Sequence, residues 1–203
     1  MTIKFRHYKD PEDYSTVSEF LIRHYLPGNR DGNWIEPAWE YMHGHPYLDA
    51  SSLEKIGIWE DAGEIVAVCH YEWQMGEAFF QFHPDYHYLQ GAMLDHAERN
   101  FRGRKDGNDP EYLHVYINDF DNELLSLVQS RGYQRKLGAD RPMAKYVIPE
   151  PFPPINLPDG FQLTSLAEDP DWAKVHRVLW RGFNHEGELP MNETELEERR
   201  KMF

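Results

Sequence analysis

The sequence predicts an α+β protein with a mixed, mostly antiparallel sheet flanked by helices. Three observations support this class. A β-like run at the start is followed by two helix-like segments, three β-like runs follow one another within residues 57–84, and a helix then separates them from another β-like run at 111–119. Strands and helices in this order form a sheet of mixed polarity with helices on its faces.

The first strand and helix are predicted close to the start of the chain. Residues 2–8 alternate between apolar and polar side chains, which is typical of a strand. A helix is expected over 10–26, with Asp10 as its cap and Pro11 at its first position. The apolar side chains of this segment fall on one helical face. They are Tyr14, Val17, Phe20, Leu21 and Tyr25.

The next elements are a second helix and a meander of three strands. The second helix is expected over 34–44, where Pro37 interrupts the pattern. The turn residues 60–63 divide two β-rich runs, which is a hairpin signal. The third strand is expected at 77–84, and an amphipathic helix follows at 92–101.

A strand, a helix and an extended run complete the first part of the chain. Residues 111–119 are β-rich, and a helix is predicted at 121–133. Asp121 is placed to cap this helix, and Gly132 lies just past its end. The chain is then expected to extend again over 134–149.

A proline-rich stretch marks the clearest boundary in the chain. Prolines at 150–159 favour an extended linker. After it, a strand is expected at 160–169, a helix at 169–183 with Asp169 as its cap, and a further helix that begins near Asn192 or Thr194.

This last part repeats the opening plan of the chain. The sequence therefore predicts a complete domain at 1–149, a linker at 150–159, and the opening strand and helices of a second domain at 160–203. A piece of this size is too short to bury a core alone. Its helices are expected to pack on the first domain or on another chain, and the second arrangement would give a homodimer through the C-terminal segment.

Composition limits the partners of the protein. The formal net charge of −14 makes nucleic acid and anionic membranes poor partners, and no apolar stretch is long enough to span a bilayer. We expect a soluble, cytoplasmic protein. The single cysteine, Cys69, excludes a disulfide within the chain. No metal site is expected, because the closest histidine pair, His43 and His45, lacks carboxylates at ligand spacing.

Two short sequence motifs, together with the order of the elements, indicate a family resemblance. The run HPDY at 83–86 precedes a helix that contains LDHAE at 94–98. The chain resembles the GNAT N-acetyltransferase superfamily, and its doubled opening resembles the tandem-domain members, with a truncated second domain. The resemblance implies a GNAT fold over 2–149 and transfer of an acetyl group from acetyl-CoA to a small-molecule amine.

The resemblance also implies where acetyl-CoA binds. In this family a splayed strand offers its backbone to the pantetheine arm, and the next turn wraps its amides around the pyrophosphate at a helix N-terminus. The positions that match are Phe80, Gln81 and Phe82 on the strand, Tyr88, Leu89, Gln90, Gly91 and Ala92 in the turn, and Asn118 after the next strand.

This chain departs from the family pattern in three ways. The turn is about two residues short and lacks the first of its usual glycines, so bulky Tyr88 and Leu89 stand where backbone usually approaches phosphate. Val128 occupies the position of the tyrosine that commonly protonates the thiolate, and it has no proton to donate. Either Asp121 stands where a second Asn is usual, and its carboxylate would repel an anionic cofactor, or that Asn is shifted to Asn122.

Acetyl transfer needs a base that deprotonates the amine. Glu72, Glu77 and His83 are the candidates, although each also suits a structural role, the two glutamates as solvated strand positions and His83 as a turn residue. Aromatic residues in the helix and loop region either line an acceptor pocket or pack in the core. They are Trp34, Trp39, Tyr41 and Tyr47.

Two functions follow from these observations. The leading one is an acetyl-CoA-dependent N-acetyltransferase with an unknown acceptor and a degenerate cofactor turn. The alternative is a non-catalytic GNAT-like domain that supports a catalytic second domain. The turn at Gly91 and the residue Val128 favour the alternative, whereas the HPDY-to-helix junction and Asn118 favour the enzyme.

Overall fold

The computed structural model describes residues 2–189 and 191–201, which divide into two compact units, Met1–Ala139 and Asp140–Phe203. The first unit contains β1 (Lys4–His7), α1 (Tyr14–His24), α2 (Glu36–Gly44), η1 (Ala50–Lys55), β2 (Gly57–Asp61), β3 (Glu64–His70), β4 (Glu77–Phe82), η2 (Pro84–Leu89), α3 (Gln90–Asn100), β5 (His114–Val115) and α4 (Asn122–Ser130). The second contains α5 (Trp172–Gly182) and α6 (Glu193–Lys201).

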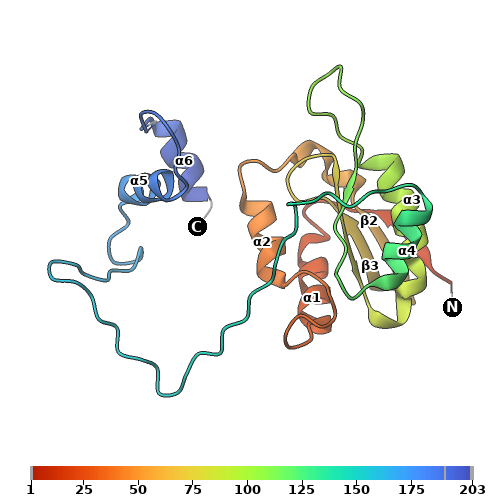
Figure 1. Cartoon of the computed structure of the whole chain (residues 1–203), viewed down its shortest axis with the longest axis horizontal. Coiled ribbons are helices and arrows are strands. Elements are labelled where there is room, and N and C mark those ends of the chain that lie inside the picture. Colours follow the sequence, from red (N-terminus) through yellow and green to blue (C-terminus); the bar gives the residue numbers. More distant parts are fainter. Residues whose placement is uncertain (1, 190, 202–203) are drawn as a thin grey trace. The chain divides into compact units, whose positions relative to one another are not determined.

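The first unit is built on one five-stranded sheet (Figure 1). Its strands lie side by side in chain order, β1 to β5. Neighbours are antiparallel from β1 to β4, whereas β4 and β5 are parallel. This arrangement confirms the predicted α+β class and the mostly antiparallel sheet.

Helices cover both faces of the sheet. In Figure 1, α1 and α2 lie on one side of β2 and β3, and α3 and α4 lie on the other. Side chains alternate along β4, so Phe79 and Gln81 share the face of α1 and α2, and Phe80 and Phe82 share the face of α3. The ring of Phe79 accordingly lies 4.8 Å from that of Trp34, which comes just before α2. Both layers are apolar and buried against the sheet.

The β2–β3 hairpin forms where the sequence predicts it. Its two central residues, Ala62 and Gly63, both have positive φ angles, of 52° and 91°. A two-residue turn with positive φ at both positions matches the twist of antiparallel strands. The prediction of a hairpin over 60–63 is confirmed.

The start of α1 differs from the prediction. The helix begins at Tyr14, and neither Asp10 nor the proline after it caps the helix. Asp13 occupies the capping position, but its carboxylate instead accepts hydrogen bonds from the Arg6 guanidinium and from the Lys9 N–H. Burial alone would raise the pKa of Asp13, yet these bonds outweigh it and lower that pKa.

Two other helix starts also correct the prediction. Pro37 lies in the first turn of α2 and does not interrupt it, since a missing N–H costs nothing there. In α5 the cap is Asp171 and not Asp169, because the Asp171 carboxylate accepts the hydrogen bond of the Lys174 N–H. By contrast, Asp121 caps α4 and Gly132, with a φ of 86°, ends it, as predicted.

Several predicted strand residues do not pair. β5 is limited to His114–Val115. Within the described residues, neither 134–149 nor 160–169 forms a strand, so both predictions of a strand there are wrong. β-prone side chains form a strand only where a neighbouring strand takes their backbone hydrogen bonds. The predicted domain boundaries at 149 and 160 remain a prediction.

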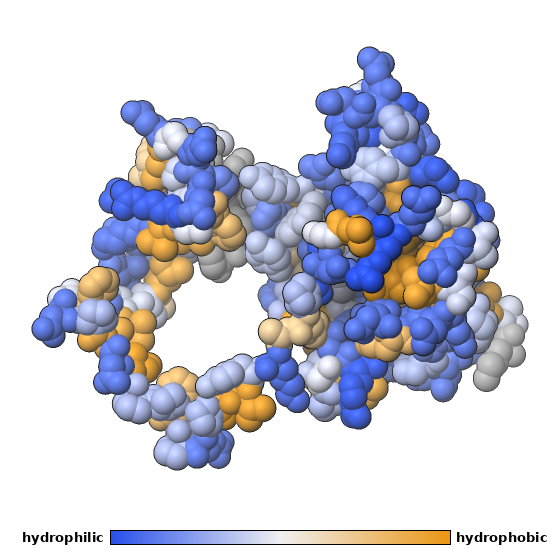
Figure 2. Space-filling view, in the orientation of Figure 1, coloured by the Kyte–Doolittle hydropathy of each residue, from blue (hydrophilic) through white to orange (hydrophobic). Residues whose placement is uncertain are grey.

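The described part of the chain holds no helix long and apolar enough to cross a membrane. On the visible surface of the first unit, hydrophilic residues predominate, with smaller apolar patches between them (Figure 2).

Candidate functional site

The sheet opens between β4 and β5. The two strands pair only at Glu77 with His114 and at Ala78 with Val115, and the Tyr116 N–H then donates to the Ala78 carbonyl at 3.0 Å. Beyond this bond, no backbone hydrogen bond joins the two strands in the described chain. The parallel strands therefore separate from about Phe79 onward.

Alternate residues of β4 turn their backbone toward this opening. The His83 N–H donates to the Val66 carbonyl at 2.9 Å, which places the odd-numbered residues of β4 in hydrogen bonds with β3. The peptide groups of Phe80 and Phe82 therefore face the opening. Among the described residues, none is seen to bond the Phe80 N–H.

The side chain of Asn33 hydrogen-bonds both polar groups of the Phe82 peptide. This residue comes from the loop between α1 and α2, and only 2% of it is exposed. Its Oδ1 accepts from the Phe82 N–H at 2.8 Å, and its Nδ2 donates to the Phe82 carbonyl at 3.0 Å. The opening thus presents the Phe80 amide beside a Phe82 peptide that is already bonded.

The predicted phosphate turn is helical. η2 continues directly into α3, since Leu89 has helical dihedral angles (φ −77°, ψ −12°) and the Gln90 N–H donates to the His87 carbonyl. Amides that would surround a phosphate are therefore engaged within the helix. Gly91 lies in its first turn, where an added side chain would meet nothing within 4 Å.

The other residues of that turn have separate environments. The side chain of Tyr88 is 63% exposed, Ala92 is exposed, and Leu89 is buried. Gln90 is also buried, and its Nε2 donates to Asp121 Oδ2 at 2.6 Å. Gln90 thus links α3 to the cap of α4, and its side chain amide serves this structural contact.

A shallow hollow of about 490 Å³ lies between η2 and the start of α4. It is lined by His87 and by residues 120–123, which include Asp121 and Glu123. Two carboxylates here repel a phosphate-bearing ligand. Asn118, the remaining predicted cofactor residue, is exposed and donates from Nδ2 to the Gly32 carbonyl at 2.8 Å.

The three predicted bases are not brought together. Glu77 opens β4 and accepts a hydrogen bond of 3.4 Å from the Tyr116 hydroxyl. Glu72 is half-buried in the loop before β4. His83 follows the other end of β4, where its Nδ1 accepts from the Asp85 N–H and its ring lies 4.6 Å from that of His24. Glu77 and His83 are six strand residues apart, roughly 20 Å.

Sequence reasoning missed a buried polar chain beside the opening. The Trp34 N–H donates to Gln81 Oε1 at 2.7 Å, and Gln81 Nε2 donates to His70 Nε2 at 2.9 Å. His70 Nδ1 in turn donates to the Tyr71 carbonyl, so the imidazole is neutral. Complete burial lowers the pKa of His70 to about 3. The available signal was a polar residue on the inward face of each of two buried strands.

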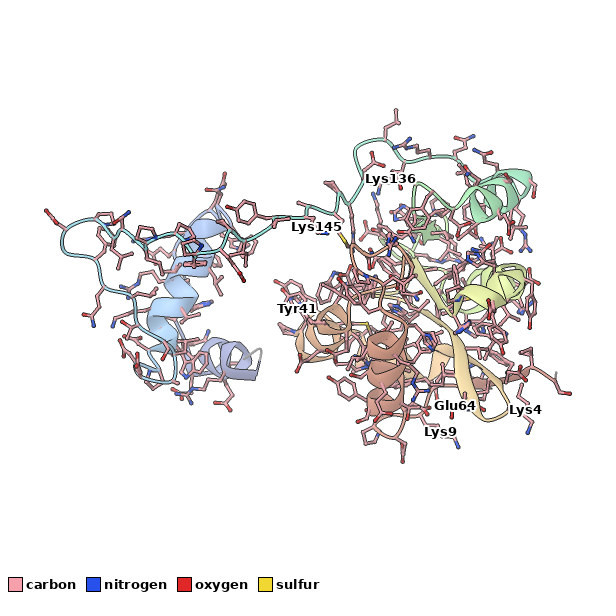
Figure 3. All side chains as sticks on the ribbon, turned by 90° about the horizontal axis from the view of Figure 1, so that it is seen from below. Lys4, Lys9, Tyr41, Glu64, Lys136 and Lys145 are labelled. Atoms are coloured by element: carbon pink, nitrogen blue, oxygen red, sulfur yellow. The ribbon has the colours of Figure 1, made fainter. Side chains whose placement is uncertain are left out.

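The aromatic residues divide between core and surface. Trp39 is fully buried, and Trp34 packs edge-on against His70 and Phe79. Tyr41, which projects from α2 in Figure 3, is 53% exposed. Its ring belongs to a surface cluster that also contains His45, Tyr47 and Trp73.

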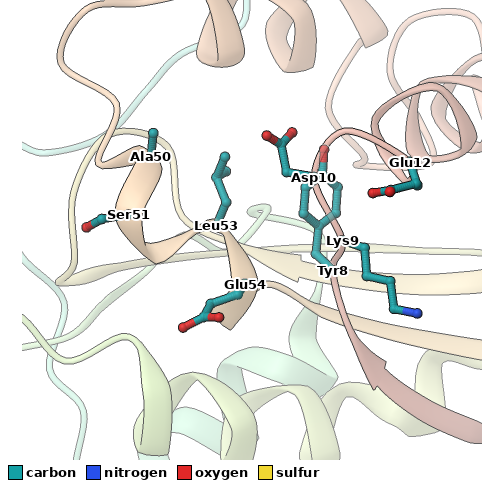
Figure 4. Close-up of a pocket in the computed structure, with 8 residues that line it drawn as sticks. All are labelled: Tyr8, Lys9, Asp10, Glu12, Ala50, Ser51, Leu53 and Glu54. Atoms are coloured by element: carbon teal, nitrogen blue, oxygen red, sulfur yellow. The ribbon is translucent and has the colours of Figure 1, made fainter.

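A second hollow of about 510 Å³ lies between the β1–α1 turn and η1 (Figure 4). Its walls carry three carboxylates, those of Asp10, Glu12 and Glu54. The hydroxyl of Tyr8 lies 3.3 Å from His43 Nε2. Within the described residues, no group of three or more His, Cys, Asp or Glu side chains is placed to hold a metal ion.

A sheet in chain order, antiparallel except for one parallel pair that separates, with a helix joining that pair, is the arrangement that the resemblance to the GNAT superfamily implies. No protein-family model matches this chain, and no curated protein matches it. Two solved acetyltransferases resemble it. The ribosomal-protein-S18-alanine N-acetyltransferase from Escherichia coli is 17% identical over 64% of this chain and 77% of that one, with a TM-score of 0.41. A possible acetyltransferase from Clostridium difficile 630 is 14% identical over 74% and 100% of the two chains, with a TM-score of 0.37.

Proposed function

We propose that this chain is a GNAT-type N-acetyltransferase that takes an acetyl group from acetyl-CoA and transfers it to an amine. The observation that carries the proposal is the opening between β4 and β5, where the Phe80 N–H faces the gap and no described residue is seen to bond it. A buried N–H without a partner costs free energy, which a ligand that accepts its hydrogen bond would recover.

The residues around the opening suit the pantetheine arm of acetyl-CoA better than its pyrophosphate. An amide-bearing pantetheine arm matches the backbone of β4, and the Phe80 N–H is the group we assign to the thioester carbonyl. A fixed amide stabilises negative charge that develops on such an oxygen. The pyrophosphate does not suit the residues around Gly91, because η2 and α3 use those amides and because Asp121 and Glu123 lie nearby.

Acetyl-CoA, when bound, supplies an activated acetyl group, and the chain must supply the base. We assign this role to Glu77. It belongs to β4 itself, on the same strand as Phe80, and the Tyr116 hydroxyl orients its carboxylate. His83 is a weaker candidate because its Nδ1 already caps η2, and Glu72 lies outside the strand.

The test is an acetyl-transfer assay that follows thiol release from acetyl-CoA over a panel of primary amines. We expect turnover with at least one amine. Glu77→Gln should lower kcat by roughly 10²-fold to 10⁴-fold with the Kd for acetyl-CoA unchanged, because a general base contributes about that much. Glu72→Gln is the matched control and should leave kcat within a few-fold of wild type.

Two results would contradict the proposal. Full activity of Glu77→Gln would remove Glu77 from the mechanism while leaving the function in place. Absence of both binding and thiol release at millimolar acetyl-CoA would reject the enzyme and support the non-catalytic alternative.

A further inference from the structure

A short loop segment crosses the mouth of the β4–β5 opening. This segment, Gly32 to Trp34, is called the strap below. Its first residue accepts the Asn118 Nδ2 hydrogen bond after β5, and its second residue bonds both polar groups of the Phe82 peptide on β4. Its third residue, Trp34, donates its N–H to Gln81 Oε1. The strap therefore spans the gap that two separated strands leave.

The Asn33 side chain makes the two hydrogen bonds that a neighbouring strand would make with β4. A carboxamide has the same donor and acceptor as a peptide group, and here both engage one peptide of β4, at 2.8 and 3.0 Å. Both partners are buried. An extended ligand with amide groups that ran along β4 past Phe80 would need the same two groups of Phe82. Asn33 and such a ligand exclude each other.

The strap is attached to the sheet by few bonds. The chain turns sharply at three residues with positive φ, Gly28 at 80° and Asn29 at 54° before the strap and Gly32 at 77° as its first residue. At Gly32 a side chain would collide with Asn118 and crowd Phe120, so only glycine permits this close approach. Release of the strap from β4 requires the loss of the two Asn33 bonds, the Trp34 bond and the ring contacts that Trp34 makes with His70 and Phe79.

We propose that the strap closes the donor site in the free protein, and that binding of the amide-bearing arm of acetyl-CoA displaces Asn33 from the Phe82 peptide. This inference rests on the proposed function, because the arm is assigned to the same opening. Asn33 then lowers the affinity for acetyl-CoA. Only the fraction of the protein in which the strap is released can bind the arm, so the observed Kd equals the intrinsic Kd divided by that fraction.

The test compares acetyl-CoA binding by titration calorimetry in the wild type, Asn33→Ala and Asn33→Ser. Both substitutions remove the two bonds that compete with the ligand for the Phe82 peptide, so the Kd should fall by about thirtyfold, which corresponds to ~2 kcal/mol. Asn100→Ala is the matched control. Its Nδ2 donates to a helix carbonyl at the far end of α3, and its Kd should equal that of the wild type.

A second readout uses the unaltered protein. In the free protein the Trp34 amide is held by Gln81 and should exchange slowly with solvent. Saturating acetyl-CoA should increase its exchange rate by at least tenfold, because the strap leaves the sheet.

The outcomes separate the two proposals. If the wild type binds and the Asn33 variants, still folded by circular dichroism, bind equally or more weakly, the strap proposal is overturned while the function stands. Unchanged exchange of Trp34 on binding overturns it as well. If no variant binds at millimolar acetyl-CoA, the proposed function fails, and the strap proposal falls with it. Tighter binding by the Asn33 variants alone supports both.

Discussion

At the scale of single residues, buried polar side chains organise the site. His70 lies fully buried between Gln81 and the Tyr71 carbonyl, and the bond in which its Nε2 accepts from Gln81 requires the neutral imidazole. A sequence pattern marks such a residue only as a break in an apolar run. Its partners come from chain segments 11 residues or more away, or from a backbone carbonyl, so its role became visible only in the fold.

The titration of His70 predicts how stability depends on pH. Its pKa is lowered to about 3 in the folded protein, whereas an unfolded histidine titrates near 6.5. Below pH 6.5 the unfolded chain binds a proton that the folded protein does not, so the free energy of unfolding falls as the pH falls. Between pH 7 and pH 5 this one residue should cost about 2 kcal/mol. Urea denaturation at the two pH values measures the difference.

The control for this prediction is His70→Asn, which keeps a donor for the Tyr71 carbonyl and does not titrate. Its overall stability should be lower at both pH values, but its loss between pH 7 and pH 5 should be smaller than that of the wild type by about 2 kcal/mol. His43 and His96, whose pKa values burial also lowers, titrate in both proteins and leave a shared residual slope. Equal losses in the two proteins would show that His70 is not the group responsible.

Gln90 provides a second prediction at this scale. Its Nε2 bonds the buried carboxylate of Asp121, so Gln90→Leu leaves that carboxylate without this donor. We expect a loss of about 2 kcal/mol in the free energy of unfolding. The exposed Gln129→Leu on α4 is the control and should change stability by less than about 0.5 kcal/mol. Comparable losses for both would argue against a special contact at Gln90.

At the scale of elements, local signals predicted what a few neighbouring residues decide. The hairpin at 62–63 and the ends of α4 depend on turn and cap chemistry within four residues, and both were predicted. The caps of α1 and α5 were not, because several aspartates precede each helix and the partners decide among them. Asp13, for example, is held by Arg6 on β1. The sequence did not predict that residues 84–89 are helical. Because they are, the amides near Gly91 bond within the helix and are not free to bind a phosphate.

Two glycines test this picture of the helix ends. Gly91 lies in the first turn of α3 with open space around it, so Gly91→Ala should raise the free energy of unfolding by up to about 1 kcal/mol. Gly132 has a φ of 86°, and Gly132→Ala should lower it by roughly 1 kcal/mol. If the amides near Gly91 play no part in phosphate binding, Gly91→Ala should also keep the Kd for acetyl-CoA. A large loss of affinity would restore the phosphate turn.

At the scale of the whole molecule, the chain exposes a long run of apolar side chains from 137 to 166. In Figure 2, apolar residues recur along this extended stretch. Tyr146 and Val147 are 80% and 76% exposed. The other members are Leu137, Met143, Ile148, Phe152, Ile155, Leu157, Phe161, Leu163 and Leu166. Exposed apolar surface of this extent is typical of an interaction surface.

A homodimer through the C-terminal segment would cover this surface, and that homodimer stays a prediction. Sedimentation velocity at micromolar concentration should show a dimer, and the double substitution Tyr146→Ser with Val147→Ser should weaken it at least tenfold. The same substitutions should leave the thermal melting of the first unit unchanged, since both residues lie outside it. A monomer over the whole concentration range would remove this prediction.

The sequence predicted the sheet, the long helices and the strand that borders the candidate site, but only some of the residues now proposed for that site. Glu77 and the β4 backbone were predicted, because they follow from the position of one strand. Asn33 was not, since it reaches Phe82 across 49 residues of chain from a loop that local patterns describe only as a turn. Contacts between distant segments lie beyond the range of such patterns.

An NMR titration with acetyl-CoA tests the proposal that the Phe80 amide in the β4–β5 opening receives the acyl donor. Amide signals of the labelled protein would be followed to saturation. The signal of the Phe80 amide should shift the most, together with the amide signals of Phe82 and the strap. Saturable shifts confined to residues 84–92, with Phe80 unmoved, would contradict it.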